Sequence, residues 1–413
     1  MIKSIITLNI IQIAKLVLPL LLLPILSARL SKNAYGLYMY TISSAIWLSI
    51  LIEYGFNIYS TREIASGNQE GSIRVIIGTQ SAKVLISIAL LPVYFILSTQ
   101  FGIFKNNELW AIFSWLLAIF IGISPIYYFQ ANEKLKTVAF TELISSGILL
   151  ISVFGVVKND ENLILLAFLL IFTRFLAILF LTHLMMAETK LRWVKIFNLN
   201  IGLEYLKKAF HFFIFQGAIS LYTSFNVVLL GMFSLSPIEV GEYASAERLI
   251  KAGLGFIGPL SQGIFPRLNK IKAQGGHGLK SIRRYALLAF LFIGFGGMAL
   301  TLIFSRFITS ILFSQDAIEI SVILNILSLV IPAIALSNLF GFLHLVVERK
   351  EKSFNKIIFV AAIVNLFLSY FMIVNYGARG LAVGWVIIEW MIVGMIFLKI
   401  VTDKYSLKSQ MGN

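Results

Sequence analysis

Long, unbroken apolar runs dominate this sequence of 413 residues and limit what it can fold into more than any other feature. A helix needs about 20 consecutive, largely apolar residues to cross the hydrocarbon core of a bilayer. Hydrophobic residues make up 59% of the chain and charged residues 13%, against roughly 25% charged in typical soluble domains. This composition excludes intrinsic disorder, and so much apolar surface could not be hidden in a soluble core. The sequence therefore predicts an integral membrane protein.

Twelve apolar runs predict twelve transmembrane helices, because membrane barrels show short alternating segments instead. The first six runs are Ile5–Leu26, Tyr35–Asn57, Val75–Leu97, Leu109–Phe129, Thr137–Val157 and Leu163–Met186. The second six are Ala209–Gly231, Tyr243–Phe265, Tyr285–Phe304, Ile320–His344, Phe354–Val374 and Gly380–Val401. We expect an all-α fold in which two six-helix bundles surround a central cavity.

Lys and Arg are distributed unevenly between the two sides of this arrangement. The side that holds both termini carries 23 of them outside the spans, and the opposite side carries 6. Connections rich in Lys and Arg remain in the cytoplasm. Both termini are therefore expected in the cytoplasm, and the net charge of +15 needs no nucleic-acid partner to explain it.

The longest connection divides the chain into an N-terminal bundle (1–187), a linker (188–208) and a C-terminal bundle (209–413). Short similar sequences in the two halves indicate that the bundles are parallel repeats of each other. In the linker, apolar residues fall at helical spacing among basic ones, which predicts an amphipathic helix on the cytoplasmic membrane face. A passive tether is the simplest role for this helix. Its residues are Trp193, Ile196, Phe197, Asn200 and Ile201.

Most catalytic chemistries lack the residues that they need. The chain has no Cys, and its four His residues are scattered, so neither thiolate chemistry nor a metal site is expected. Gly253–Gly258 fits the pattern G-x-G-x-x-G, but it lies in an apolar run with no strand before it. Close helix packing explains these glycines better than nucleotide binding does. We expect a chain that is not an enzyme and has no cofactor.

Five basic residues fall inside the predicted spans, where a charge costs at least about 2.5 kcal/mol and marks a functional site. Arg248 and Lys83 are near enough to a membrane face to extend to it, and Lys251 can pair with Glu247 as readily as bind a ligand. Lys15 and Arg174 have no acid one helical turn away and are expected to face a water-filled cavity. Such a cavity would attract an anionic substrate. The five are Lys15, Lys83, Arg174, Arg248 and Lys251.

Glu389 is the one acidic residue that is predicted deep in a span. Carboxyl groups inside the membrane frequently carry protons or ions. Coupling of transport to H+ or Na+ and a simple ion pair with a neighbouring cation both remain open for it.

Several short motifs are similar to those of one transporter family. They are Asn33–Tyr38, Glu53–Phe56, Arg62–Ala65, Val240–Leu249, Pro259–Pro266 and Tyr376–Gly384. Through these motifs the chain resembles, over essentially its full length, the O-antigen (Wzx-type) flippases. These form the polysaccharide-exporting branch of the multidrug/oligosaccharidyl-lipid/polysaccharide exporter superfamily.

The resemblance implies translocation of an undecaprenyl-diphosphate-linked O-antigen or related oligosaccharide across the bacterial inner membrane by alternating access. It places Lys15, Arg29, Arg248 and Lys251 along the cavity, and Arg174 joins them through its predicted depth. It also implies membrane lipids, a polysaccharide polymerase and a chain-length regulator as partners. The uncharged seventh span departs from the family pattern. A cation-coupled drug antiporter of the same superfamily and a lipid II flippase are the alternatives.

Overall fold

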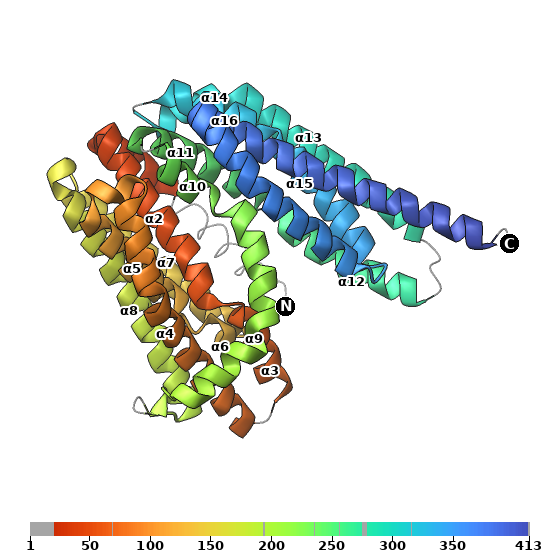
Figure 1. Cartoon of the computed structure of the whole chain (residues 1–413), viewed down its shortest axis with the longest axis horizontal. Helices are drawn as coiled ribbons and strands as arrows, with labels where there is room; N and C mark the ends of the chain where they lie inside the picture. Colours follow the sequence, from red (N-terminus) through yellow and green to blue (C-terminus); the bar gives the residue numbers. More distant parts are fainter. Residues whose placement is uncertain are drawn as a thin grey trace. The chain divides into compact units, whose positions relative to one another are not determined.

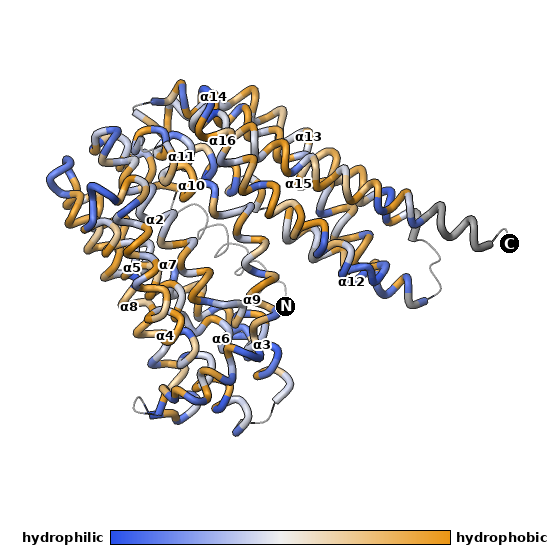
Figure 2. The backbone as a smooth tube through the Cα atoms, in the orientation of Figure 1, coloured by the Kyte–Doolittle hydropathy of each residue, from blue (hydrophilic) through white to orange (hydrophobic). Residues whose placement is uncertain are grey.

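The computed structural model describes residues 20–67, 69–192, 195–234, 236–255, 257–274, 279–314 and 316–411. Throughout these residues the chain forms helices joined by short connections, without any β-strand (Figure 1). The predicted all-helical class is thus confirmed. Hydrophobic residues extend along the helices, and hydrophilic residues gather mainly at helix ends and connections (Figure 2).

Eight helices in the described part are long and apolar enough to cross a membrane, and one bent pair adds a ninth candidate. The chain is therefore a multi-pass membrane protein. Of the first predicted span, the described residues show only the end, a helix from Leu20 to Arg29. The predicted eighth span is divided between α11 (Pro237–Leu254) and α12 (Ile257–Ala273), and neither helix is among the candidate spans.

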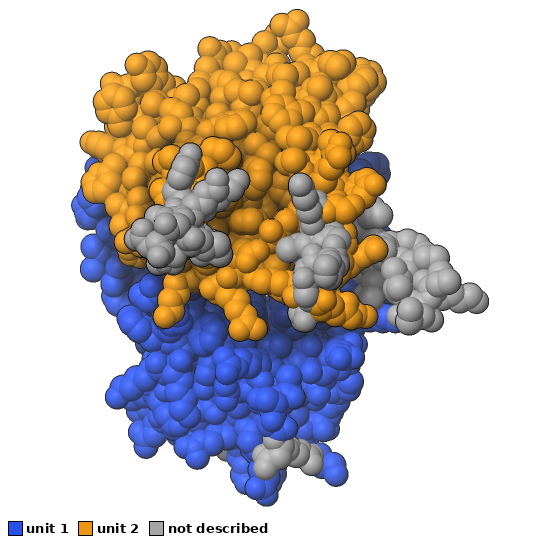
Figure 3. All heavy atoms as spheres, turned by 90° about the vertical axis from the view of Figure 1, so that its right-hand side faces the viewer, with its two compact units in different colours: residues 1–241, 313–315 blue, residues 242–312, 316–413 orange. Residues whose placement is uncertain are grey.

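Two compact units make up the chain and are coloured separately in Figure 3: Met1–Gly241 with Phe313–Gln315, and Glu242–Leu312 with Asp316–Asn413. The helices of unit 1 are α2 (Lys32–Glu53), α3 (Phe56–Ser66), α4 (Gln69–Gln100), η1 (Ile103–Asn106), α5 (Glu108–Gly122), α6 (Ile126–Ala131), α7 (Leu135–Val156), η2 (Asp160–Asn162), α8 (Leu163–Thr189), α9 (Leu199–Thr223) and α10 (Asn226–Phe233). Unit 2 holds most of α11, then α12, α13 (Leu279–Leu312), α14 (Ala317–Ser328), α15 (Val330–Ser337), η4 (Asn338–Val346) and α16 (Glu351–Met411).

The core of unit 1 forms where α2 packs along α5 and where α4 packs along α9. Helix α4 approaches α9 closely through Gly78, since a Cβ there would lie 2.4 Å from the ring of Tyr205. This packing places α9 in unit 1, whereas the sequence assigns Ala209–Gly231 to the second bundle. In the other unit, α12, α13, α15 and η4 enclose a separate apolar core.

The linker between α8 and α9 differs from its prediction. Residues 195–198 are not α-helical, and α9 begins at Leu199, where the Asn198 side chain accepts a hydrogen bond from the N–H of Ile201 at 3.1 Å. An asparagine at this position ends the preceding irregular segment and starts a new helix. The predicted helix therefore does not extend through Ile196 and Phe197, and Trp193 lies outside the described residues.

The second predicted span is interrupted where α2 ends. Tyr54 and Gly55 have φ values of 55° and 76°, so the backbone is left-handed at both. The carboxylate of Glu53 accepts hydrogen bonds from the N–H groups of Gly55 and Asn57, which begin α3. Negative charge is favourable at a helix N-terminus, so this contact explains why an acidic residue lies within an apolar run.

The last helix, α16, consists of two antiparallel segments joined at a glycine (Figure 1). Gly377, with φ 58° and ψ −141°, interrupts the helix between predicted spans eleven and twelve. The chain reverses there, because Lys350 before α16 donates to Asp403 near its far end at 2.8 Å. This backbone conformation is nearly restricted to glycine. The reversal therefore takes place with almost no loop.

Candidate functional site

Arg29 joins the end of the first helix to the end of α7. Its Nη1 donates to the carbonyl oxygens of Val153 (3.2 Å), Phe154 (2.7 Å) and Val157 (2.6 Å). A cation is stabilised at a helix C-terminus, where carbonyl groups lack helical partners. Within the described residues, no carboxylate neutralises this charge. Lys15, its predicted partner in the site, lies outside the described residues, and its role remains a prediction.

Arg174 has an acidic partner, although no acid lies one helical turn away from it, and its position beside a water-filled cavity stays a prediction. Its Nη1 donates to the carboxylate of Glu142, and the two side chains are 32% and 18% exposed. Glu142 lies on α7 and Arg174 on α8, two helices that pack together. The acid thus comes from a neighbouring helix, which the spacing of residues along α8 cannot reveal.

Arg248 and Lys251 lie on α11, three residues apart and therefore on one helix face. The Lys251 Nζ contacts the Glu247 Oε2 at 2.9 Å, with side chains 38% and 6% exposed. The intrahelical pair that the sequence left open is therefore formed. Arg248 is half-buried and has no ion pair or hydrogen bond among the described residues. Among the predicted substrate ligands that the structure describes, Arg248 is the one whose side chain is not held by a partner.

Glu389 is buried in the second half of α16, with 4% of its surface exposed. Its Oε1 accepts a hydrogen bond from the Trp385 Nε1 at 3.1 Å, one helical turn away. No Lys or Arg pairs with it in the described part of the chain. The described residues therefore do not form the predicted ion pair with Glu389, and its proton or ion coupling stays a prediction.

Lys83 on α4 is fully buried, so the prediction that it extends to a membrane face is wrong. Its Nζ donates to the Ser124 carbonyl oxygen at 2.9 Å and lies 5.1 Å from the centre of the Tyr127 ring. A carbonyl dipole and an aromatic face both stabilise a cation without neutralising it.

Other polar groups surround Lys83 inside unit 1. Gln80 Nε2 donates to the Tyr127 hydroxyl at 3.2 Å, and the hydroxyls of Ser60 and Thr79 are 2.7 Å apart. Together they form a polar interior within an otherwise apolar bundle. The run Thr79-Gln80-Ser81 just before Lys83 is the signal that could have identified it, because polar residues on adjacent turns predict a shared buried face.

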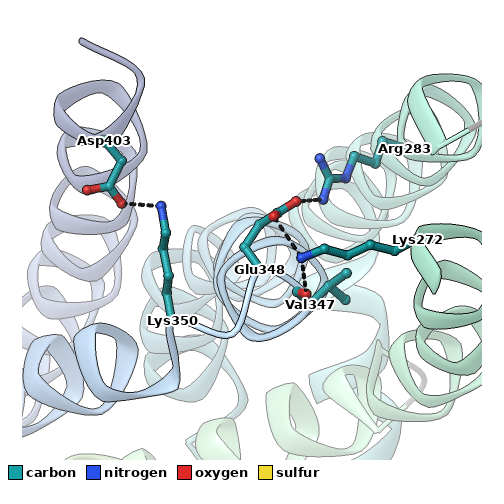
Figure 4. A network of polar contacts seen from close by, with 6 residues as sticks. All are labelled: Lys272, Arg283, Val347, Glu348, Lys350 and Asp403. Atoms are coloured by element: carbon teal, nitrogen blue, oxygen red, sulfur yellow. Dashed lines mark hydrogen bonds and ion pairs between the residues drawn. The ribbon is translucent and has the colours of Figure 1, made fainter. Parts of the chain in front are cut away.

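A second polar network lies in unit 2, outside the apolar spans (Figure 4). Glu348 accepts hydrogen bonds from Lys272 Nζ at 2.8 Å and Arg283 Nη2 at 2.5 Å, and Lys272 also donates to the Val347 carbonyl at 2.7 Å. Partial burial opposes ionisation, but the two cations outweigh it and lower the pKa of the Glu348 carboxyl to about 2. This carboxylate therefore ties together the ends of α12, α13 and η4.

The structure brings the predicted site residues together only in part. Arg248 and Lys251 share a face of α11, while Arg29 and Arg174 are held by different partners on α7. The described residues contain no group of three or more His, Asp or Glu that could hold a metal ion. The described residues offer fixed positive charges for an anion and, in Glu389, a buried carboxyl group that has no paired cation among them.

Known proteins resemble the chain along nearly its whole length. It is 24% identical over 411 residues to a protein of Escherichia coli (strain K12) named as a candidate O-antigen transporter, and the match covers 97% of both chains. A Shigella dysenteriae protein of the same name is 26% identical over 395 residues, covering 95% of this chain and 98% of that protein.

Solved structures establish the type of fold. A lipid II flippase MurJ, in an inward closed conformation, superposes with a TM-score of 0.77 at 16% identity, covering 97% of this chain and 87% of the other. An inward-facing multidrug resistance MATE family transporter of the MOP superfamily gives a TM-score of 0.66 at 13% identity, covering 97% and 96%. The family of polysaccharide biosynthesis proteins matches residues 1–272, about two thirds of the chain. The chain therefore belongs to the polysaccharide biosynthesis protein family.

Proposed function

We propose that this protein is a flippase that moves an undecaprenyl-diphosphate-linked O-antigen or related oligosaccharide across the bacterial inner membrane. The observation that carries the proposal is the full-length similarity to two proteins named as candidate O-antigen transporters. The cargo crosses without any covalent change, so the protein is not an enzyme. The chain also shares its fold with a protein named as a lipid II flippase, which supports a lipid-linked cargo.

In this proposal, twelve spans form two six-helix bundles around a central cavity, with both termini in the cytoplasm. The diphosphate of the cargo binds Lys15, Arg248 and Lys251, and its sugars occupy the water-filled cavity. A charge pair at 4 Å is worth about 4 kcal/mol at an effective dielectric constant of 20, enough for binding that still permits release. The polyprenyl tail stays in the lipid.

The remaining predicted residues, Arg29, Arg174 and Glu389, have different roles in the proposed transport. Arg29 keeps its positive charge while it caps α7, so it can still attract a phosphate at the membrane surface. Arg174 reaches a phosphate only by giving up Glu142. Glu389 is buried without a cation among the described residues, as a residue that exchanges H+ or Na+ would be. A polysaccharide polymerase and a chain-length regulator are the protein partners that we propose.

The test uses cells that synthesise the lipid-linked repeat unit but lack their own flippase. We expect the wild-type chain to restore the ladder of surface polysaccharide on a gel, and Arg248→Ala and Lys251→Ala to abolish or strongly reduce it. Lys270→Ala is the matched control, because Lys270 is exposed near the end of α12 and makes no ion pair in the described part. Immunoblots must show equal amounts of protein in the membrane.

Glu247→Gln separates substrate binding by Lys251 from a purely structural ion pair. If Lys251 only neutralises Glu247, adding Glu247→Gln to Lys251→Ala should restore the ladder, because no buried charge is then left unpaired. If Lys251 binds the diphosphate, the double variant should remain as defective as Lys251→Ala, whereas Glu247→Gln alone should keep most of the ladder. A normal ladder in both cation variants at normal protein level would contradict the assigned site. Drug resistance without any ladder would indicate an antiporter instead.

A further inference from the structure

A cavity within unit 1 opens between α4, α5, α8 and the segment before α9. Its volume is about 230 Å³. Nearly all of its wall is apolar, and the amide of Gln80, one of its few polar groups, already donates to Tyr127. The lining includes Val84, Phe120, Phe175, Leu179, Ile196 and Phe197.

The rim of the cavity is apolar and accessible. Phe175 and Leu179 on α8 are 40% and 41% exposed, and Phe197 is 48% exposed. In a membrane protein, exposed apolar side chains on a spanning helix face lipid chains rather than water. The cavity therefore communicates with the hydrocarbon region beside α8. By comparison, an apolar cavity of about 150 Å³ holds benzene, so this one holds roughly nine carbon atoms of a chain.

Three cations lie on the chain segment that closes the cavity. Lys190, Arg192 and Lys195 are exposed, and none has a side-chain hydrogen bond or ion pair in the part of the chain that the structure describes. Lys195 directly precedes Ile196 and Phe197 in the cavity wall. The nearest acid in the sequence, Glu188, is already bound by Lys134 at 2.8 Å. The three positive charges are thus free to bind an anion.

The spacing along α8 matches the anatomy of a lipid. Thr182, in the cavity wall, is about 10 Å below Thr189 at 1.5 Å per residue, and the cations begin at the next residue. A phospholipid has its charged phosphate at the membrane surface and its chains at this depth below it. A free anion would use the cations and leave the apolar cavity empty, whereas a neutral lipid would use the cavity alone.

We propose that this cavity, together with Lys190, Arg192 and Lys195, binds an anionic phospholipid of the surrounding leaflet as a resident ligand. One acyl chain enters between α4 and α8, and the phosphate contacts the three cations. Basic residues beside an opening between transmembrane helices are the known pattern for such lipid headgroups. The bound lipid would hold the segment before α9 against α4 and α8. The site shares no residue with the proposed cargo ligands, so the inference does not depend on the proposed function.

The test is native mass spectrometry of the full-length purified protein titrated with dioleoyl phosphatidylglycerol or, as a neutral probe, dioleoyl phosphatidylcholine. Replacing Lys190, Arg192 and Lys195 together by Ala should weaken phosphatidylglycerol binding about a hundredfold, because each cation contributes roughly fivefold. Leu179→Trp should reduce the binding of both lipids by filling the cavity. Ile303→Trp is its control, since Ile303 is 71% exposed on α13.

A charge-matched control separates a built site from general attraction to a basic surface. It replaces the exposed cations Lys270, Lys352 and Lys356 of unit 2 by Ala and should leave phosphatidylglycerol binding within about twofold of wild type. An equal loss in both triple variants would overturn the proposal, as would equal affinity for the two lipids. Displacement of the bound lipid by polyprenyl diphosphate at equal concentration would also overturn it, because the cargo would then be the occupant.

Discussion

Replacing Glu348 by Gln removes one negative charge from the network of Figure 4 and tests whether that network stabilises unit 2. The fold lowers the pKa of this carboxyl from its ordinary 4.5 to about 2. A folded pKa that lies one pH unit below the unfolded pKa stabilises the fold by about 1.4 kcal/mol, so the full difference is worth about 3 kcal/mol. The Glu348 side chain is still 29% exposed, and solvent screening reduces the expected loss to about 1–2 kcal/mol at pH 7.

The pH dependence gives the sharper test. Because the folded pKa is depressed, the stabilisation is complete above pH 4.5 and disappears as the pH falls toward 2. Denaturant unfolding in detergent, followed by tryptophan fluorescence, should show a clear difference between wild type and Glu348→Gln at pH 7 and less than half of that difference at pH 3. Glu133→Gln, which changes an exposed acid without an ion pair in the described part, should match wild type at both pH values. A gap that stays constant down to pH 3, or no gap at pH 7, would refute the reasoning.

Three further predictions use the same unfolding assay. Lys83→Met should be as stable as wild type or more stable, because an apolar residue of similar volume avoids burying a charge; a loss above about 2 kcal/mol would contradict this. Gly36→Ala should destabilise by about 2 kcal/mol or more, since its Cβ would lie 1.8 Å from a backbone carbonyl oxygen, whereas Gly217→Ala, with open space around it, should not. A double-mutant cycle of Arg174→Ala and Glu142→Ala should give a coupling energy of about 1–3 kcal/mol, and zero coupling would show that the pair contributes nothing.

The apolar helices could be predicted from the sequence because each depends on a local property, a run of about 20 residues. The same is true of the reversal near Gly377, which falls between two predicted spans. The interruption after Glu53 was missed, although the sequence Glu53-Tyr54-Gly55 contains its cause. Hydropathy averages over a window and does not register one or two residues with left-handed backbone.

The candidate site was less predictable, because the partners of its charged side chains are distant in sequence. Arg174 finds Glu142 on another helix, and Arg29 finds carbonyl groups at the end of α7. Only the pair of Glu247 and Lys251, four residues apart, was visible as an alternative in advance. For Lys83 the sequence predicts a side chain that extends to the membrane face, whereas the structure buries it inside unit 1. The position of a residue along a span does not tell whether its side chain faces lipid or the interior of the bundle.

The final two spans are fastened at both ends, by the reversal at Gly377 and by the contact between Lys350 and Asp403. A helical hairpin held in this way can tilt as a rigid body, but its two helices cannot separate from each other. Bending within unit 2 is then left to neighbours such as η4, where nine residues form the wider turn of a π-helix. An epitope tag inserted at residue 377 would consequently disrupt the helical hairpin, because there is no surface loop at this position to accommodate it.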